Sequence, residues 1–274
     1  FLKKDIEGRI AYWEEPETGV LDTLTGFEEY VKERKKDGIF SIAYLYFSHN
    51  RFEEARSWFS KIITEDRFSD EAKNAARNII RTYQDVGDWK SIRDTANRYL
   101  ANMIAPGEEN SDFAKELRQY GAEANWQIAQ TVLKTAEQLG QAQRREESSA
   151  AFADAAKRFE SFFIEFPKSE NRAEALRLAA ACFGKAGQTE RSADLFKEFI
   201  RLFPKNENAP IYMSQIAESY MSILEFDKSL EYYEILYKRT KNDPKHKDLK
   251  LAALQNKPVL KVGIGDYVGA AKGY

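Results

Sequence analysis

A recurring spacing of 37 residues is the feature that most constrains how this chain folds. Five segments share one pattern, in which charged or polar residues are followed by a small or aliphatic residue and then by an apolar helical stripe. That residue is, in order along the chain, Ala55, Ile92, Ala155, Ser192 and Ser229. The spacings are 37, 63, 37 and 37 residues, and 63 exceeds 37 by 26. A fixed period of this length predicts stacked structural repeats, with about 26 residues inserted between the second and third copies.

Each period is predicted to be a pair of helices. In the first copy Ile39, Ile42, Ala43 and Tyr46 follow the i, i+3, i+4, i+7 spacing of one helical face. A turn follows, and the second stripe is Ala55, Phe59 and Ile62. Small residues at fixed places in both helices allow the two helices of a pair to approach closely. With 14 Gly and 7 Pro in 274 residues, chain breakers are scarce, which favours an all-α protein.

Composition excludes several classes of protein. Lys and Arg number 42 against 44 Asp and Glu, so the net charge is −2, whereas nucleic-acid binders usually carry a basic excess. We therefore expect no nucleic acid as partner. No apolar run is long enough to predict a membrane span. A single cysteine, Cys182, excludes an intrachain disulfide framework.

The repeated pattern resembles the tetratricopeptide repeat family. That family has a large residue at place 4, small residues at places 8 and 20, aromatic residues at 11 and 24, and proline at 32. Pro167 and Pro204 occupy the last place in two copies, whereas the first copy has Arg67 there. The family period of 34 residues is three shorter, and the extra residues fall in the turn between repeats. Turns such as Phe203–Asn208 resemble those of bacterial cell-envelope members, which implies a periplasmic location, although a cytoplasmic adaptor also fits.

The resemblance predicts an all-α, TPR-like α-solenoid of antiparallel helix pairs with one elongated central helical hairpin. The hairpin includes a long helix from Asp112 to about Gln143. Tyr267 is expected to start the second helix of a last, unfinished pair, so we expect the native protein to continue beyond Tyr274. The expected organisation is an imperfect N-terminal repeat over 1–36, two repeats over 37–105, the elongated hairpin over 106–170, two repeats over 171–244, and a truncated repeat over 245–274.

No residue pattern indicates catalysis. His49 and His246 are expected to be solvated, and neither has a second His or a Cys at metal-ligand spacing. Cys182 lies on an apolar helical stripe, where a buried thiol is expected. Phosphate-binding loops, nucleophile elbows and zinc-binding helices have no match. The sequence therefore predicts a protein that is not an enzyme and that uses no cofactor or metal.

The resemblance also implies a binding surface, because the family lines its concave face with places 2, 5, 9 and 12 of each first helix. The positions carried over are Phe40, Tyr44, Phe47, Arg77, Arg81, Gln84, Arg177 and Glu218. Exposed aromatic and Arg side chains are typical anchors of protein interfaces. Two alternatives stay open: the aromatics pack against helices around Phe27 and Tyr30, or the arginines pair with acidic residues of the chain. Members that clamp chaperone tails have Lys at place 5 and Asn at place 9, and this chain lacks both there.

The predicted function is a scaffold or adaptor that binds a partner protein or peptide, with a possible role in envelope assembly. One alternative makes the chain the helical part of a larger enzyme, such as a cell-wall lytic enzyme, whose catalytic domain lies elsewhere. Another alternative is self-association into a structural assembly.

Overall fold

The structure, a computed structural model, describes residues 27–272. The predictions for residues 1–26 lie outside this range. The chain divides into two compact units, Phe1–Asn125 and Trp126–Tyr274. The described part of each unit consists of helices, and no strand occurs within 27–272. The prediction of an all-α fold of antiparallel helix pairs is confirmed.

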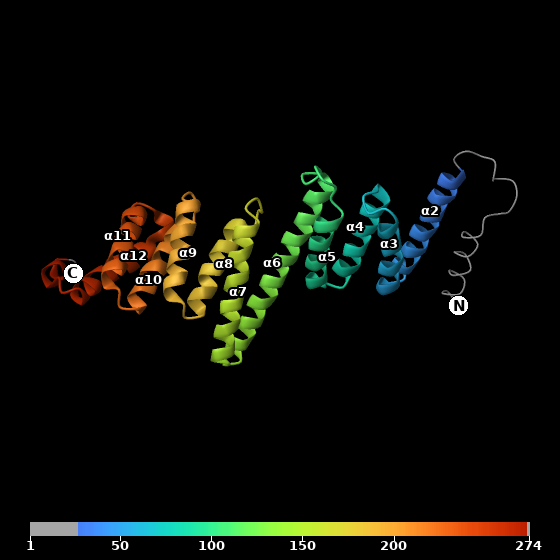
Figure 1. The fold of residues 1–274 in the computed structure, drawn as a ribbon. Helices are drawn as coiled ribbons and strands as arrows, with labels where there is room; N and C mark the ends of the chain where they lie inside the picture. The colour runs from blue at the N-terminus through green and yellow to red at the C-terminus, as the bar shows by residue number, and fades with distance from the viewer. Residues whose placement is uncertain (1–26, 273–274) are drawn as a thin grey trace. The chain divides into compact units, whose positions relative to one another are not determined.

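The first unit contains two regular helix pairs. They are formed by α2 (Phe27–Ser48) with α3 (Phe52–Glu65) and by α4 (Asp70–Asp85) with α5 (Trp89–Asn102). Neighbouring helices pack side by side, α2 on α3, α3 on α4, and α4 on α5 (Figure 1). The predicted stripes form its core, since Ile39, Tyr46 and Phe59 are buried together with Ile79, Ile92 and Tyr99. The start of α6 (Asp112–Gln141) joins this core through Phe113 and Leu117.

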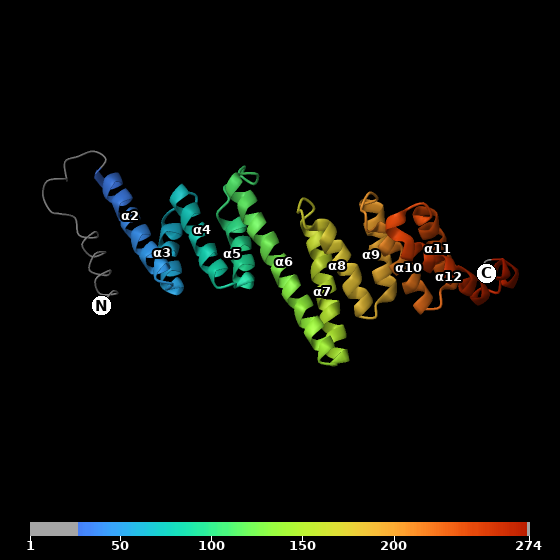
Figure 2. The same ribbon diagram turned by 180° about the vertical axis from the view of Figure 1, so that it is seen from behind.

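The second unit continues with longer and then regular helices. Its elements after α6 are α7 (Arg145–Glu165), α8 (Arg172–Lys185), α9 (Thr189–Leu202), α10 (Ala209–Ser222), α11 (Phe226–Thr240), the 3₁₀ turn η1 (Pro244–His246), α12 (Lys247–Gly263) and α13 (Tyr267–Ala271). Each helix from α7 to α12 packs on the next, as Figure 2 also shows. Aromatic rings fill the space between helix pairs: Phe199 meets Tyr212 edge-on at 4.8 Å between ring centroids.

Each helix pair is joined by the same left-handed turn. The residue with positive φ is Asn50, Gly87, Gln143, Gly187, Leu224 or Gly265, with φ between 58° and 84°. The amide of the following residue donates to the carbonyl five residues earlier, at 2.8–3.0 Å between N and O. This pattern ends the first helix with its carbonyls satisfied and leads directly into the second.

The turns set the register of the second helix of each pair, because a buried residue follows each turn residue after five positions. These residues are Ala55, Ile92, Ser148, Ser192, Ser229 and Ala270. Two of the serines also bond across the pair. Ser148 Oγ donates to Ala136 O at 2.9 Å, and Ser229 Oγ donates to Ala217 O at 2.8 Å. The close approach of the two helices is therefore reinforced by a buried hydrogen bond in these pairs.

The elongated central hairpin is confirmed, and the long helix predicted from Asp112 to about Gln143 ends at Gln141. The repeat spacing marks Ala155, which is reached along a helix and not from a turn. The left-handed turn lies at Gln143, and Ser148 is the buried residue five positions after it. Ala155 is also buried, two helical turns further along α7. It lies 12 residues before Pro167, the same spacing that separates Ser192 from Pro204. The insertion is therefore divided. Relative to the second pair, α6 has 14 extra residues (30 against 16), α7 has 7 (21 against 14), and loop 103–111 has 5 more than loop 66–69, together 26.

Candidate functional site

The candidate surface of the first unit lies on α2 and α4, the first helices of its two regular pairs. We call it the α2–α4 surface, made of Phe40, Tyr44, Phe47, Arg77, Arg81 and Gln84. The start of α4 is fixed by Ser69, whose Oγ accepts a hydrogen bond from the Ala72 amide at 3.2 Å. Asp70 and Glu71 in the first turn complement the helix dipole. These caps fix the helix from which Arg77 and Arg81 project.

The three aromatic residues on α2 differ in exposure. Tyr44 is 50% exposed, whereas Phe40 and Phe47 are half-buried against the core. Phe40 packs edge-on against Phe59 at 5.3 Å between ring centroids. The expectation that all three face outward is therefore corrected, because Phe40 and Phe47 contribute to packing between α2 and α3. The alternative that Phe27 and Tyr30 cover the aromatics concerns side chains outside the described residues.

Phe47 lies at the centre of a small cluster. Its ring is 5.9 Å from that of Tyr44 and 5.7 Å from that of Phe52, between centroids. The guanidinium of Arg81 lies over the Phe47 ring, 5.6 Å from its centroid. Arg81 and Gln84 are both exposed. Tyr44, Phe47 and Arg81 therefore bring an exposed aromatic ring and a cation together on one face.

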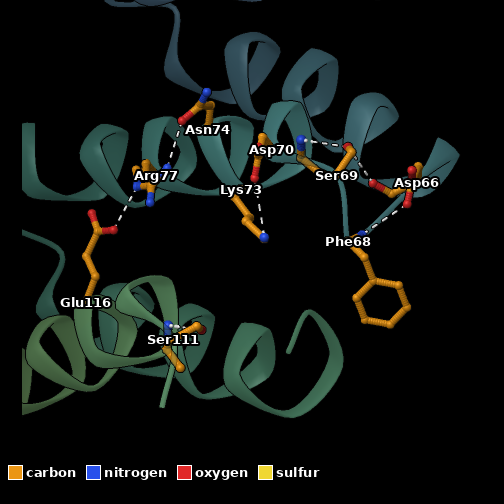
Figure 3. A network of polar contacts seen from close by, with 11 residues as sticks. Asp66, Phe68, Ser69, Asp70, Lys73, Asn74, Arg77, Ser111 and Glu116 are labelled. Atoms are coloured by element: carbon orange, nitrogen blue, oxygen red, sulfur yellow. Dashed lines mark hydrogen bonds and ion pairs between the residues drawn. The ribbon is translucent and has the colours of Figure 1, made fainter. Parts of the chain in front are cut away.

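Arg77 has a different role, because it is already paired within the chain. Its Nε donates to Glu116 Oε2 on α6 at 2.7 Å, and its Nη1 donates to Asn74 Oδ1 at 2.7 Å. Figure 3 shows Arg77 pointing from α4 towards Glu116. The alternative of pairing within the chain is thus correct for Arg77. No carboxylate of the described residues lies within 4.0 Å of Arg81.

Glu116 and Tyr120 on α6 join this network and were missed from the sequence. The hydroxyl of Tyr120 donates a hydrogen bond to Glu116 Oε1 at 3.2 Å. Burial raises the pKa of Tyr120, and the negative charge of Glu116 raises that pKa further. The i, i+4 spacing of these two residues on a helix beside α4 is the signal that points to them.

Arg177 and Glu218 lie in the second unit, each bonded to a residue of its own helix. Arg177 Nε donates to Glu174 Oε2 at 2.8 Å on α8, and hydrogen bonding to Glu174 raises the pKa of Arg177. Ser214 Oγ donates to Glu218 Oε1 at 2.9 Å on α10. No ion pair within the described range joins Arg177 to Glu218. Each is thus a local helical pair within the second unit.

The first unit also has a cleft that the sequence did not indicate. It has a volume of about 670 Å³ and lies where α3 and α5 end. Its walls include Ile63, Phe68, Arg98, Tyr99 and Met103. Asp66 lies beside it, at the place where the second unit has Phe203, which packs on Phe199 at 5.0 Å. The missing aromatic residue at position 66 is the sequence signal for this cleft.

The residues considered for chemistry are placed as follows. Cys182 is buried, and burial raises the pKa of its thiol to about 11, so it is protonated at neutral pH. His49 is exposed as expected. The expectation for His246 is wrong: it is half-buried, and its Nδ1 lies 2.8 Å from Asp243 Oδ2. Within residues 27–272, no group of three or more His, Cys, Asp or Glu is arranged to hold a metal ion. In the same range no helix combines the length and apolar character needed to span a bilayer.

Comparison with known proteins identifies one repeat directly. Residues 174–206, which span α8, α9 and the turn after them, match the family model described as Tetratricopeptide repeat. The resemblance to this family is confirmed. No curated protein sequence matches the chain.

Several solved structures are similar in fold. They include BtubC from P. vanneervenii (13% identity, 81% of this chain and 85% of that chain, TM-score 0.41). Another is PilW, a type IV pilus biogenesis factor (16% identity, 87% of this chain and 90% of that chain, TM-score 0.38). A third is a thermophilic TPR protein of Thermus thermophilus (17% identity, 80% of this chain and 97% of that chain, TM-score 0.33). Likenesses of this size carry no information on shared partners.

Proposed function

We propose that this chain, which carries a tetratricopeptide repeat, is a non-catalytic scaffold that binds a partner protein or peptide on the α2–α4 surface. The observation that carries the proposal is the cluster of Tyr44, Phe47 and Arg81. Tyr44 is half exposed, and Arg81 has no carboxylate partner within 4.0 Å in the part of the chain that the structure describes. Aromatic and Arg side chains on rigid elements are the residues that most often dominate interface energies.

The cluster is suited to binding because its members are held in place before a partner arrives. Phe47 is fixed by Phe52 and the core, and it supports both the Tyr44 ring and the Arg81 guanidinium. Little side-chain entropy is then lost when a partner covers the cluster. Gln84, one helical turn after Arg81, supplies exposed amide groups for hydrogen bonds at the rim.

The proposal is tested by affinity capture from an extract of the source organism, comparing the native chain with Tyr44→Ala/Arg81→Ala. We expect the double variant to lose the proteins that the native chain retains. A matched control is Arg67→Ala/Phe68→Ala, which removes another stacked pair of the first unit, 4.8 Å from guanidinium to ring centroid. Recovery of the same proteins by the Tyr44→Ala/Arg81→Ala variant would exclude this surface.

The proposal extends to a place of action in bacterial envelope assembly. Support comes from the lengthened turns Phe166–Asn171 and Phe203–Asn208, which share the Phe-Pro-Lys pattern. In both, the Phe ring folds back onto the preceding helix, 5.0 Å from Phe162 and Phe199 respectively. Fractionation of the source cells tests this part separately. Recovery of the protein with the cytoplasm instead of the envelope would contradict the location and leave the binding proposal intact.

A further inference from the structure

The cleft where α3 and α5 end differs from the same place in the second unit by one aromatic residue. Asp66 occupies the repeat position that Phe166 and Phe203 hold in the second unit. Each of those two rings turns back onto the helix before it, with 5.0 Å between ring centroids. The Asp66 carboxylate instead accepts a hydrogen bond from the Phe68 amide, 3.1 Å away (Figure 3). The first unit thus has a carboxylate where the second has a phenyl ring.

A second difference lies on α5. In the second unit Arg239 of α11 reaches the turn after α9 and donates to Pro204 O at 2.7 Å. The equivalent residue of α5 is Asn102, which is shorter and donates to Arg98 O of its own helix at 2.9 Å. Among the described residues no hydrogen bond or ion pair joins α5 to the turn at 66–69. The cleft of about 670 Å³ therefore lacks the bridge that closes the same place in the second unit.

The lining of the cleft is suited to an aromatic ring. Tyr99 and Met103 supply buried apolar surface, and a thioether makes favourable contacts with rings. The guanidinium groups of Arg67 and Arg98 lie 4.8 and 5.2 Å from the centroids of the Phe68 and Tyr99 rings, respectively. In the part of the chain that the structure describes, neither arginine has a carboxylate within 4.0 Å. A planar guanidinium has two faces, so each of these groups can stack on one more ring.

The rim of the cleft offers hydrogen-bond acceptors. The hydroxyls of Ser60 and Thr64 donate hydrogen bonds to carbonyls of α3 at 2.7 and 2.8 Å, so their oxygens can still accept. Asn102 uses its amide nitrogen within α5, which leaves its Oδ1 as an acceptor. All three residues line the cleft. The backbone amides of an extended peptide are donors that match such acceptors.

We propose that this cleft binds an aromatic side chain that a partner protein presents on an extended segment. The ring takes the place that Phe203 has in the second unit and stacks on the guanidinium of Arg67 or Arg98, while the backbone amides of the segment donate to the rim. The volume of the cleft lies within the range of about 300–1,000 Å³ that is usual for ligand sites. The site is formed by α3, α5 and the turn after α3, so it is separate from the α2–α4 surface and does not rest on the function proposed for that surface.

The methionines provide the readout, because Met103 lines the cleft whereas Met213 and Met221 lie in the second unit. NMR of the whole chain with labelled methionine methyl groups follows all three during titration with the peptide acetyl-Gly-Phe-Gly-amide. The Met103 resonance should shift and saturate with a Kd of about 1 mM, while the other two stay in place. Acetyl-Gly-Leu-Gly-amide, and benzyl alcohol as a ring without peptide groups, should each bind about tenfold more weakly.

Asp66→Phe is the decisive variant, because it supplies the ring from the chain itself. It should abolish the shift of Met103 by the Phe peptide and raise the midpoint of urea unfolding. Asp66→Ala, which removes the carboxylate without filling the cleft, should bind as the native chain does. Asn102→Arg restores the bridge seen at Arg239 and should weaken binding by about tenfold, which decides the matter if Asp66→Phe does not fold. An unmoved Met103 resonance in the native chain, equal binding of the Leu peptide or of benzyl alcohol, or undiminished binding by the filled variants would overturn the proposal.

The two sites of the first unit can be told apart with the same probe. Arg67→Ala/Phe68→Ala, the control for the α2–α4 surface, alters one wall of the cleft. It should therefore lose the Phe peptide and still retain the proteins held by the α2–α4 surface. Tyr44→Ala/Arg81→Ala should bind the Phe peptide as the native chain does. Loss of the peptide by Tyr44→Ala/Arg81→Ala, with binding kept by Arg67→Ala/Phe68→Ala, would place the ring outside the cleft and contradict the proposal.

Discussion

Arg77 on α4 and Glu116 on α6 form an ion pair with 2.7 Å between Nε and Oε2. Glu116 also accepts a hydrogen bond from the hydroxyl of Tyr120, so one carboxylate contacts a cation from α4 and a phenol from α6. Both ion-pair side chains are about one-third exposed, at 37% and 31%. The pair therefore aligns α4 with the start of α6 inside the first unit, and it leaves Arg81 as the cation available on the α2–α4 surface.

A double-mutant cycle on Arg77→Ala and Glu116→Ala measures the strength of this pair. Since the charges are partly solvated, we expect a coupling of about 0.5–1 kcal/mol in the free energy of unfolding, decreasing with added salt. Urea denaturation of the four proteins provides the value. A second readout is Glu116→Gln, which should lower the pKa of Tyr120, followed by NMR of the tyrosine ring carbon. A coupling near zero together with an unchanged pKa would show that the contact is absent in solution.

Phe40 and Tyr44 should separate stability from binding on α2. Phe40→Ala removes a ring packed on Phe59, so we expect a loss of about 1–3 kcal/mol in unfolding free energy. Tyr44→Ala removes a half-exposed ring, and its effect should stay within about 0.5 kcal/mol. Thermal and urea unfolding measure both. If Tyr44→Ala destabilised the chain as much as Phe40→Ala, the Tyr44 ring would belong to the core.

The helix pairs were predictable because their information is local. Ile39, Ile42 and Tyr46 show the period of a buried face directly in the sequence, and each of them is buried. The left-handed turns are a second local signal, and the turn glycines Gly87 and Gly187 occupy the same place in the 37-residue repeat. Local propensity and periodic burial therefore agree along the regular repeats.

Two details lie beyond what periodicity encodes. In the central hairpin a helix two turns longer repeats the same apolar stripe, so that Ser148 and Ala155 are both buried and both fit the pattern. The second detail is the partner of Arg77, because Glu116 lies 39 residues away on the elongated helix. Pairing over such a distance depends on how α6 packs in the first unit, which periodicity does not encode.

Leu224→Gly should stabilise the protein. Leu224 adopts a φ of 63°, a conformation that costs a residue with a Cβ roughly 1–2 kcal/mol, and its side chain is 73% exposed. The equivalent turns use Gly87, Gly187 and Gly265. After the entropy that glycine adds to the unfolded chain, we expect a gain of about 0.5–1 kcal/mol in urea unfolding. Gly187→Ala is the matched reverse and should destabilise by a similar amount. A loss of stability in Leu224→Gly would mean that the Leu224 side chain makes contacts worth more than the backbone strain.

Ser229 should tolerate a smaller residue but not a larger one. It is fully buried, and its hydroxyl donates a hydrogen bond to Ala217 O across the contact between α11 and α10. Ser229→Ala loses one buried hydrogen bond, about 1 kcal/mol. Ser229→Val places a larger side chain in a fully packed site and should lower the unfolding free energy by more, about 2–3 kcal/mol. Equal effects in chemical denaturation would show that the helices have room to separate.

Cys182 should make the protein less stable at alkaline pH. Burial raises the pKa of its thiol from 9.0 to about 11, so the folded chain holds this proton where the unfolded chain releases it. The stabilisation is fully present below pH 9 and is lost as pH rises through about 11. Two pH units correspond to a loss on the order of 2–3 kcal/mol. Tyr233, with its pKa raised to about 12, acts in the same direction at higher pH.

Cys182→Ala separates the thiol from the tyrosines. The variant should be somewhat less stable at neutral pH because it leaves a small void, but its unfolding free energy should fall less steeply between pH 9 and 11 than that of the native chain. Urea denaturation across this range measures the difference. In the folded native chain the thiol should also resist a thiol-reactive probe until urea unfolds the protein, because the reactive thiolate is not formed in the core. Parallel stability curves for the two proteins, or rapid labelling of folded Cys182, would contradict a buried, protonated thiol.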